Sequence, residues 1–397
     1  MEVKKNIIII GEMEMPNKNA AAQRTWALCR SLIDIGYHPV VVGLGNTNEN
    51  NILNTFTTDE EMDFYCDCNP VTNMSKIKRM IRISQFVKVI DHYGKHTIKA
   101  VIAQEHESIS LYRLKRYCRR NSLALVVDTF EWYEKSRWKF PIGLIKNIDT
   151  SLRMEAIYPT VDNMICISRY LYEHYRPYVK NIIMVPGTIV QTDKKWNKKN
   201  EYKKNEILTI GYAGSPGRKG EKERADWIVE SVCKLNELGI PCRAFFVGGR
   251  AQSLIENFRP DLKGLPFYKK SIVYLGQKTH EECIEIISKC DFSVIAREDK
   301  RVTKAGFPTK LSESLGAGTP VITTPSSNIS DFIVQGVNGI VVNECSCESL
   351  LEGIKKAFDI YSKEDMALIH QNVKYTNPLV HSNYNAELSN FFNRLVE

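Results

Sequence analysis

A strand–helix–strand pattern recurs along most of this chain, and it limits the fold more than any other feature. The apolar run at residues 7–10 precedes an amphipathic segment at 20–35, which stops at Gly36 before the next apolar run at 38–44. The apolar runs are short, as buried strands are, whereas the segment between them has helical periodicity. Alternation of this kind predicts parallel sheets with helices on both faces, an α/β fold of the doubly wound type.

One polar segment divides this pattern into two halves. Residues 191–206 have the sequence QTDKKWNKKNEYKKNE, which is strongly basic and lacks apolar periodicity, so we predict a linker there. A chain of 397 residues also exceeds one comfortable hydrophobic core, which favours two domains. We therefore expect one domain over residues 1–190, a second over 207–376, and a final helix within 377–397.

The composition predicts a globular protein of the cytoplasm. Its 43% hydrophobic and 25% charged residues are ordinary, and no apolar run reaches membrane-spanning length. The start MEVKKNIIII passes from a short basic lead directly into a strand, without a signal-peptide cleavage site. The pairs Cys66/Cys68 and Cys345/Cys347 lack the second pair or histidine cluster of a zinc site, so no metal site is predicted.

The formal charge of +8 is concentrated in three basic stretches, residues 76–88, 113–120 and 194–204. They lack interleaved aromatic residues and a DNA-reading motif, so we expect no nucleic-acid partner. Residues 76–90 predict an amphipathic helix with a basic face. Two interpretations of that face stay open: a solvated surface of a core-packed helix, or reversible contact with the anionic inner face of a membrane, with residues 113–120 as a second contact surface.

The sequence AGFPTKLSESLGAGTPVI joins a polar turn, a short helix and an apolar strand in an order that suits phosphate binding. Gly306 permits close approach to the backbone, Pro308 restrains φ, and Thr309 is expected to cap the helix, so that the first N–H groups face an anion. Lys310 adds a positive charge. Glu313, one turn later, is placed to accept hydrogen bonds from sugar hydroxyls.

These residues resemble the donor-binding signature of the GT-B glycosyltransferases, in particular retaining glycosyltransferase family four, also called glycosyl transferases group one. The resemblance covers nearly the whole chain. It implies two doubly wound Rossmann-like domains facing a central cleft, with the nucleotide-sugar donor on the second domain and the acceptor on the first. It also implies that the C-terminal helix crosses back to the first domain. One departure is Ala305, which stands where the family usually has a glutamate eight positions before Glu313.

The resemblance further implies which residues hold the donor. A glycine-rich turn matches the family's diphosphate loop, although Ser215 replaces its arginine and Lys219 comes one residue early. We expect Arg297, at a strand end, to supply the missing positive charge. No Asp-x-Asp motif stands at a strand end, so protein cations are expected to replace a divalent metal. The predicted donor-binding residues are Gly214, Ser215, Gly217, Arg218, Lys219, Gln277, Lys278, Arg297, Gly306, Phe307, Thr309, Lys310, Leu311 and Glu313.

The acceptor is expected on the first domain, near the loop after its first strand and at the ends of two later strands. The candidate residues are Asn19, Arg24, Glu105, His106, Asp128 and Glu131. In a retaining front-face displacement the leaving phosphate accepts the acceptor's proton, so no side-chain base is required. We therefore predict the cations Lys219, Arg297 and Lys310 as catalytic residues, with Asp128 positioning the reacting sugar.

The resemblance implies a retaining, metal-independent hexosyltransferase without a cofactor. It would move a sugar from a nucleoside diphosphate donor, UDP more than GDP, to a saccharide or lipid-linked saccharide acceptor in cell-surface polysaccharide synthesis. Two alternatives stay open: a nucleotide-sugar epimerase on the same fold, and a non-catalytic nucleotide-sugar-binding partner protein. An NAD-binding oxidoreductase is disfavoured because no G-x-G-x-x-G follows the first strand.

Overall fold

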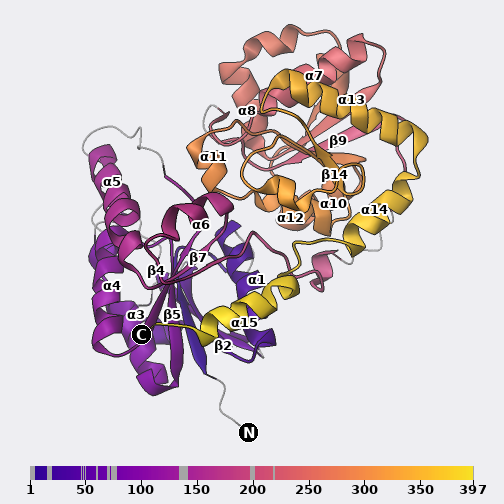
Figure 1. Cartoon of the computed structure of the whole chain (residues 1–397). Coiled ribbons are helices and arrows are strands. Elements are labelled where there is room, and N and C mark those ends of the chain that lie inside the picture. The colour runs from indigo at the N-terminus through magenta and orange to yellow at the C-terminus, as the bar shows by residue number, and fades with distance from the viewer. Residues whose placement is uncertain are drawn as a thin grey trace. The chain divides into compact units, whose positions relative to one another are not determined.

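The chain forms two compact units, which are described separately. The computed structural model describes residues 5–15, 20–45, 47, 49, 51–59, 61–68, 72, 78–133, 142–196, 202–217 and 220–396 (Figure 1). The first unit consists of Met1–Val190 together with His381–Glu397, and the second of Gln191–Val380. The expected linker at 191–206 therefore falls within the second unit.

The sheet of the first unit has eight strands in the described part of the chain, in the order β3-β4-β2-β1-β5-β6-β7-β8. Neighbouring strands are parallel except for the antiparallel pair β3 and β4. Because the other strands run in one direction, their carboxyl ends meet at one edge. The strands are β1 (Asn6–Ile10), β2 (His38–Gly45), β3 (Thr57–Asp59), β4 (Met62–Cys68), β5 (Ile98–Gln104), β6 (Ala124–Thr129), β7 (Asn163–Cys166) and β8 (Asn181–Met184).

The helices of the first unit include one from the end of the chain. Helix α15 packs against α1 and β8, where Phe391 and Phe392 are fully buried and the ring of Phe392 lies 5.5 Å from that of Tyr37. The Asn163 side chain accepts from the N–H of Val396 and donates to its carbonyl, at 2.9 and 2.8 Å. The helices are α1 (Ala20–Asp34), α3 (Ser84–Tyr93), α4 (Ser108–Arg120), α5 (Ile142–Ser151), a π-helical segment Leu152–Ile157, α6 (Arg169–Tyr175) and α15 (Asn385–Asn393).

The sheet of the second unit is parallel throughout its described strands, in the order β11-β10-β9-β12-β13-β14. Its core contains side chains from β9, β10 and β12 and from α7 and α13. The strands are β9 (Leu208–Ala213), β10 (Cys242–Val247), β11 (Ile272–Tyr274), β12 (Phe292–Ile295), β13 (Val321–Thr323) and β14 (Gly339–Val341). The helices are α7 (Ala225–Glu237), α8 (Gly249–Phe258), α9 (Tyr268–Ser271), α10 (His280–Ser288), α11 (Arg301–Ala305), α12 (Thr309–Gly316), α13 (Cys347–Lys363) and α14 (Met366–Tyr375).

The prediction of one amphipathic helix over residues 76–90 is wrong. A helical turn at 78–81 is separated from α3, which begins at Ser84. At the break, Arg82 donates to both carboxylate oxygens of Asp67 at 2.8 and 2.9 Å. Arg79 forms an ion pair with Glu12 at 2.5 Å. Two cations of the expected basic face are therefore held by carboxylates of the same unit, while residues 76 and 77 lie outside the described residues.

Candidate active site

A small pocket lies where β9 and β12 of the second unit end, beside α10 and α12. Gly211 and Ala213 of β9 and Val294 and Ile295 of β12 line it, together with Lys310 and Glu313 of α12. In parallel sheets, ligands collect at the carboxyl ends of the strands. The structure therefore brings Lys310 and Glu313, two of the predicted donor residues, to the edge where a ligand is expected.

The start of α12 differs in one detail from the expectation. Pro308 occupies the N-cap position with φ −76° and ψ 115°, and no side chain caps the helix. The prediction that Thr309 caps the helix is therefore wrong, because Thr309 is already its first residue. The N–H of Leu311 donates to the carbonyl of Pro308 at 3.0 Å. The first turn of α12 still carries the partial positive charge of a helix N-terminus.

Lys310 belongs to a buried polar group that includes Glu223 and Tyr212. Its Nζ forms an ion pair with Glu223 and donates to the Tyr212 hydroxyl at 3.5 Å. The same ammonium lies 4.6 Å from the centre of the Tyr212 ring. Burial and the neighbouring Glu223 carboxylate raise the pKa of Tyr212 well above its ordinary value, so the phenol stays protonated. Sequence reasoning did not find Glu223, because its partner is distant in the chain.

Gly214 allows Lys310 to reach this position. Its φ is +124°, and a Cβ at this residue would lie 2.6 Å from Cε of Lys310. Any other residue would thus be strained and would displace the lysine. Ser215 accepts a hydrogen bond from the N–H of Gly217 at 3.3 Å, which stabilises the turn. The predicted phosphate contacts Arg218 and Lys219 lie outside the described residues.

Arg297 follows β12 and is buried, with 6% of its surface exposed. Its guanidinium donates to the carbonyl of Gly306 at 3.1 Å and to that of Lys222 at 3.4 Å. The residue therefore joins the loop that precedes α7 to the turn that precedes α12. These contacts position the two loops, while contact of Arg297 with a diphosphate stays a prediction.

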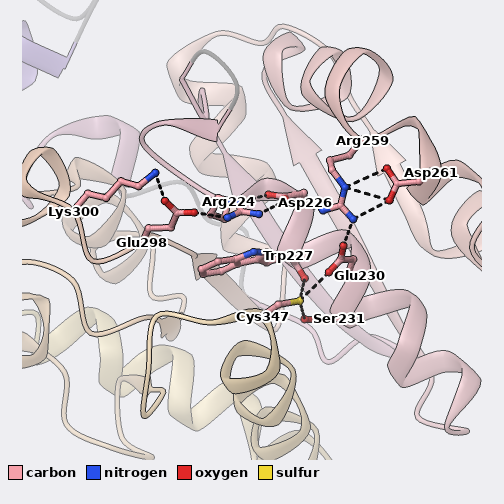
Figure 2. Close-up of polar contacts among 10 residues, drawn as sticks. All are labelled: Arg224, Asp226, Trp227, Glu230, Ser231, Arg259, Asp261, Glu298, Lys300 and Cys347. Carbon is pink, nitrogen blue, oxygen red and sulfur yellow. Dashed lines mark hydrogen bonds and ion pairs between the residues drawn. The ribbon is translucent and has the colours of Figure 1, made fainter. Parts of the chain in front are cut away.

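A second connection, from the start of α7 to the segment that follows β12, was missed by sequence reasoning (Figure 2). Arg224 donates to both oxygens of Asp226, at 2.9 and 2.6 Å, and forms an ion pair with Glu298. Its guanidinium lies 4.5 Å from the Trp227 ring centre. Glu298 also pairs with Lys300, just before α11. The pairing of Arg224 with Asp226 could have been expected from their Arg-x-Asp spacing at the start of α7. The pairing with Glu298 becomes evident only in the structure.

The other end of this network holds α7 to the segment that follows α8. Arg259 donates to Asp226 at 3.0 Å and pairs with Glu230 and Asp261. Cys347 lies beside Glu230, with Sγ 3.2 Å from its carboxylate. Burial and the neighbouring Glu230 carboxylate raise the pKa of this thiol to about 12, so it stays protonated.

Glu313 lies beside the helix start that follows the donor candidates Gln277 and Lys278. One Glu313 oxygen is 3.0 Å from Nε2 of His280, the first residue of α10. Gln277 and Lys278 directly precede this helix, and Lys278 pairs with Glu282 at 3.6 Å. The structure thus places three of the predicted donor residues around one helix start.

Two of the remaining donor candidates, and the neighbouring Ala305, are buried. Phe307 and Leu311 are buried, and the Phe307 ring packs edge-to-face on Phe332 at 5.5 Å. These two side chains shape the turn and contribute to the core. Ala305 is fully buried at the end of α11, where the family usually has a glutamate.

In the first unit, Arg24 and Asp128 form a buried ion pair. Arg24 donates to Asp128 through Nη2 at 2.6 Å and through Nε at 3.0 Å, and Gln104 donates to the same carboxylate at 2.8 Å. Nη1 of Arg24 donates to the carbonyls of Val185 and Pro186 at 3.0 and 3.2 Å. Asp128 has no exposed surface. As placed, this carboxylate holds α1 against the sheet and is not open to a sugar.

Glu105, His106 and Glu131 come together where β5 and β6 end. Glu105 has a φ of +45°, which is strained for a residue other than glycine. Its Oε1 accepts from the N–H groups of Phe130 and Glu131 at 2.8 and 3.2 Å. Burial raises the pKa of Glu105 to about 7 and lowers that of His106 to about 4. Neither ring nitrogen of His106 has a hydrogen-bond partner among the described residues. Asn19 lies outside them.

Comparison with solved structures shows that the architecture is the GT-B fold. Sucrose-phosphate synthase from Thermosynechococcus elongatus is similar with a TM-score of 0.70 and 12% identity, over 98% of this chain and 99% of that one. HepE from Anabaena, solved with UDP-glucose, is similar with a TM-score of 0.59 and 13% identity, over 98% of this chain and 100% of that one. WaaG, a glycosyltransferase involved in lipopolysaccharide biosynthesis, is similar with a TM-score of 0.62 and 13% identity, over 98% of this chain and 100% of that one.

The family comparison concerns the second unit. Residues 207–359 match the family described as Glycosyl transferases group 1, which confirms the resemblance for this part of the chain. None of the curated proteins compared with the chain is similar enough to match. The pocket, Lys310 and Glu313 all lie within the matched residues.

Within the described ranges, neither a metal-binding cluster nor a membrane-spanning helix is present. No group of three or more histidine, cysteine, aspartate or glutamate side chains there is arranged to hold a metal ion. None of the helices in those ranges has both the length and the apolar character needed to span a bilayer.

Proposed function

We propose that this protein is a retaining glycosyltransferase that moves a hexose from a nucleoside diphosphate sugar to a saccharide or lipid-linked saccharide. The arrangement of Lys310 carries this proposal. Its ammonium lies at the N-terminal end of α12 and beside Gly214, in a pocket at the carboxyl ends of β9 and β12. A cation, a helix N-terminus and a glycine turn are what a diphosphate requires.

UDP is the donor nucleotide that we favour. HepE, which shares the fold, was solved with UDP and with UDP-glucose. WaaG is described as acting in lipopolysaccharide biosynthesis, which supports a role of the present protein in cell-surface polysaccharide synthesis. We propose that Glu313 accepts hydrogen bonds from the ribose hydroxyls, since it lines the pocket one helical turn after Lys310.

In the proposed reaction, the bond between the sugar and the diphosphate breaks while negative charge accumulates on the leaving group. Lys310 and Lys219 stabilise this charge, together with the first N–H groups of α12. Arg297 joins the loop before α7 to the turn before α12, and Arg224 holds the start of α7 to the segment that follows β12. The leaving phosphate accepts the acceptor's proton on the same face, so that the configuration is retained and no side-chain base or metal ion is needed.

A second candidate is a nucleotide-sugar-binding protein without catalysis. Its support is that Ala305 is fully buried and stands in place of the family's glutamate, and that Ser215 replaces an arginine. An epimerase on the same fold is less well supported, because paired acidic residues for that reaction were not identified in the sequence.

The test is to incubate the purified chain with UDP-glucose, UDP-galactose, UDP-N-acetylglucosamine and GDP-mannose, each with and without saccharide acceptors. Acceptor-dependent release of nucleoside diphosphate supports a transferase. Interconversion of donors without acceptor indicates an epimerase. Calorimetric binding without release indicates the non-catalytic protein, and absence of both binding and release contradicts all three.

A further inference from the structure

The first unit exposes a set of apolar side chains on α4 and α5, two helices that contact each other. On α4, Ile109 and Tyr112 are 47% and 50% exposed. On α5 and the π-helical segment that continues it, Leu144, Ile145 and Ile148 are 51%, 43% and 50% exposed, and Leu152 is 46% exposed. An exposed apolar patch flanked by charge is typical of a surface that binds a partner or a membrane.

Helical spacing places these side chains on shared faces. Residues 144, 148 and 152 are separated by four positions each, and 145 adjoins them, so they form one stripe. Ile109 and Tyr112 are one turn apart on α4, whose opposite face is buried. The two helices pack together, and Asp149 accepts from both the N–H and the hydroxyl of Ser108 at 2.8 and 2.7 Å.

Basic residues continue the exposed face of α4. Arg113, Arg116 and Arg120 are exposed and follow Ile109 and Tyr112 at helical spacing. α4 carries no acidic residue. Arg116 lies 5.9 Å from the centre of the Tyr112 ring, and both residues are exposed. We call these nine residues the α4–α5 face: Ile109, Tyr112, Arg113, Arg116, Arg120, Leu144, Ile145, Ile148 and Leu152.

Fewer acidic than basic groups lie beside this face. Glu107 at the N-cap of α4, Asp149 on α5 and Glu155 in the π-helical segment are carboxylates, whereas α4 carries five arginine and lysine residues. The expected basic stretch at 76–88 is a poorer docking surface, because Arg79 pairs with Glu12 and Arg82 with Asp67. The combination of aliphatic residues, a tyrosine and arginines is therefore concentrated on α4 and α5.

We infer that the α4–α5 face docks on the surface of an anionic membrane, with its apolar side chains entering the headgroup region and its arginines contacting lipid phosphates. Aliphatic side chains gain free energy by leaving water for the acyl boundary, and tyrosine is suited to that interface. Arginines near an anionic surface add attraction that salt screens. This docking goes beyond the proposed sugar transfer and is independent of donor binding.

The experiment is co-sedimentation of the full chain, without nucleotide, with vesicles of phosphatidylcholine alone or with about one-third phosphatidylglycerol. Recovery on the anionic vesicles should exceed that on neutral ones at least about tenfold at low salt and fall as salt rises to about 0.5 M. The double variants Ile145→Ser/Ile148→Ser and Arg116→Glu/Arg120→Glu should each weaken binding about tenfold or more.

Matched controls come from the second unit. Leu238→Ser/Leu368→Ser removes two side chains that are 62% and 52% exposed, and Lys269→Glu/Lys270→Glu reverses two exposed charges. Both should bind like the unchanged protein. Circular dichroism and melting confirm that each variant is folded. Equal recovery on both vesicles, no recovery on either, or unchanged binding of both α4–α5 variants overturns the inference. So does a dimer in light scattering that Ile145→Ser/Ile148→Ser converts to a monomer, since the face would then bind a second copy.

Discussion

Lys310 and Glu223 form an ion pair at the edge of the second sheet where a diphosphate is expected. Glu223 is only 5% exposed, and the Lys310 ammonium also contacts Tyr212. A lysine held this way occupies one position before any ligand arrives. Such preorganisation is what charge stabilisation in catalysis requires. The carboxylate also competes with a phosphate for the same ammonium. Substitutions of Lys310 and of Glu223 are therefore expected to have different effects.

Replacement of Lys310 by alanine should reduce turnover about a hundredfold or more, because one fixed charge at the leaving group is lost. The measurement is the steady-state rate of nucleoside diphosphate release. Lys355→Ala, at an exposed position of α13, is the matched control and should leave the rate unchanged. A near-normal rate in a folded Lys310→Ala protein would remove Lys310 from the site. Lys219→Ala is expected to behave like Lys310→Ala.

The variant Glu223→Gln should bind UDP more tightly, by about threefold to tenfold. Its amide cannot hold Lys310 as an ion pair, so the ammonium no longer leaves a charged partner when the diphosphate binds, a gain on the order of 1 kcal/mol. Isothermal titration calorimetry measures this affinity. Glu223→Asp keeps the charge and should not show the gain. Weaker binding by Glu223→Gln would mean that the carboxylate positions Lys310 and does not compete with the ligand.

Removal of the Glu313 carboxylate should mainly weaken donor binding. In the proposed site Glu313 holds the ribose, which is bound alike in the ground state and the transition state. Glu313→Ala is therefore expected to raise KM and the Kd for UDP, with kcat changed little. Glu281→Ala, at a neighbouring position on α10, serves as the control. Unchanged affinity in Glu313→Ala contradicts this assignment.

The buried pair of Arg24 and Asp128 should dominate the stability of the first unit. Asp128→Asn leaves the arginine buried with a weakened partner, and breaking such a pair costs about 3–5 kcal/mol of unfolding free energy. Chemical denaturation measures this loss. Asp359→Asn, at an exposed position of α13, should change stability by less than about 0.5 kcal/mol. A stable Asp128→Asn protein with a large loss of turnover would instead support the predicted role of Asp128 near the reacting sugar.

The neighbours Glu105 and His106 should make opposite contributions to the pH dependence of stability. The pKa of Glu105 is about 7 in the folded protein against an ordinary 4.5, so its contribution is full below pH 4.5 and lost as pH rises through 7. The pKa of His106 is about 4 against 6.5, so its contribution is full above pH 6.5 and lost as pH falls through 4.

Single variants should reveal the two contributions. Relative to the unchanged protein, the unfolding free energy of Glu105→Gln should rise with pH between about 4.5 and 7, by about 1 kcal/mol per pH unit. That of His106→Gln should fall with pH between about 4 and 6.5. Denaturant titrations at several pH values measure both slopes, with the exposed Glu155→Gln as a flat control. Slopes of the same sign, or none, contradict the burial of these groups.

The sequence alone determined the architecture, because the elements are set by local periodicity. Short apolar runs alternating with amphipathic segments specify strands and crossover helices, and the structure confirms two parallel-dominated sheets. The position of Lys310 and Glu313 on a helix after a strand end was also readable, since Gly306 and Pro308 restrict the turn before it.

Only the tertiary structure decided which distant residues meet. Lys310 and Glu223 are 87 positions apart, and Arg24 and Asp128 are 104 apart. The side chains of such pairs are brought together by sheet order and helix packing, which no local period encodes. The same holds for the break before α3, where Arg82 reaches Asp67 on β4, and for α15, which packs on the first unit from the end of the chain. An unpaired buried charge costs several kcal/mol, so each buried charge needs a partner. Which residue that partner is depends on the tertiary fold and cannot be read from the local sequence.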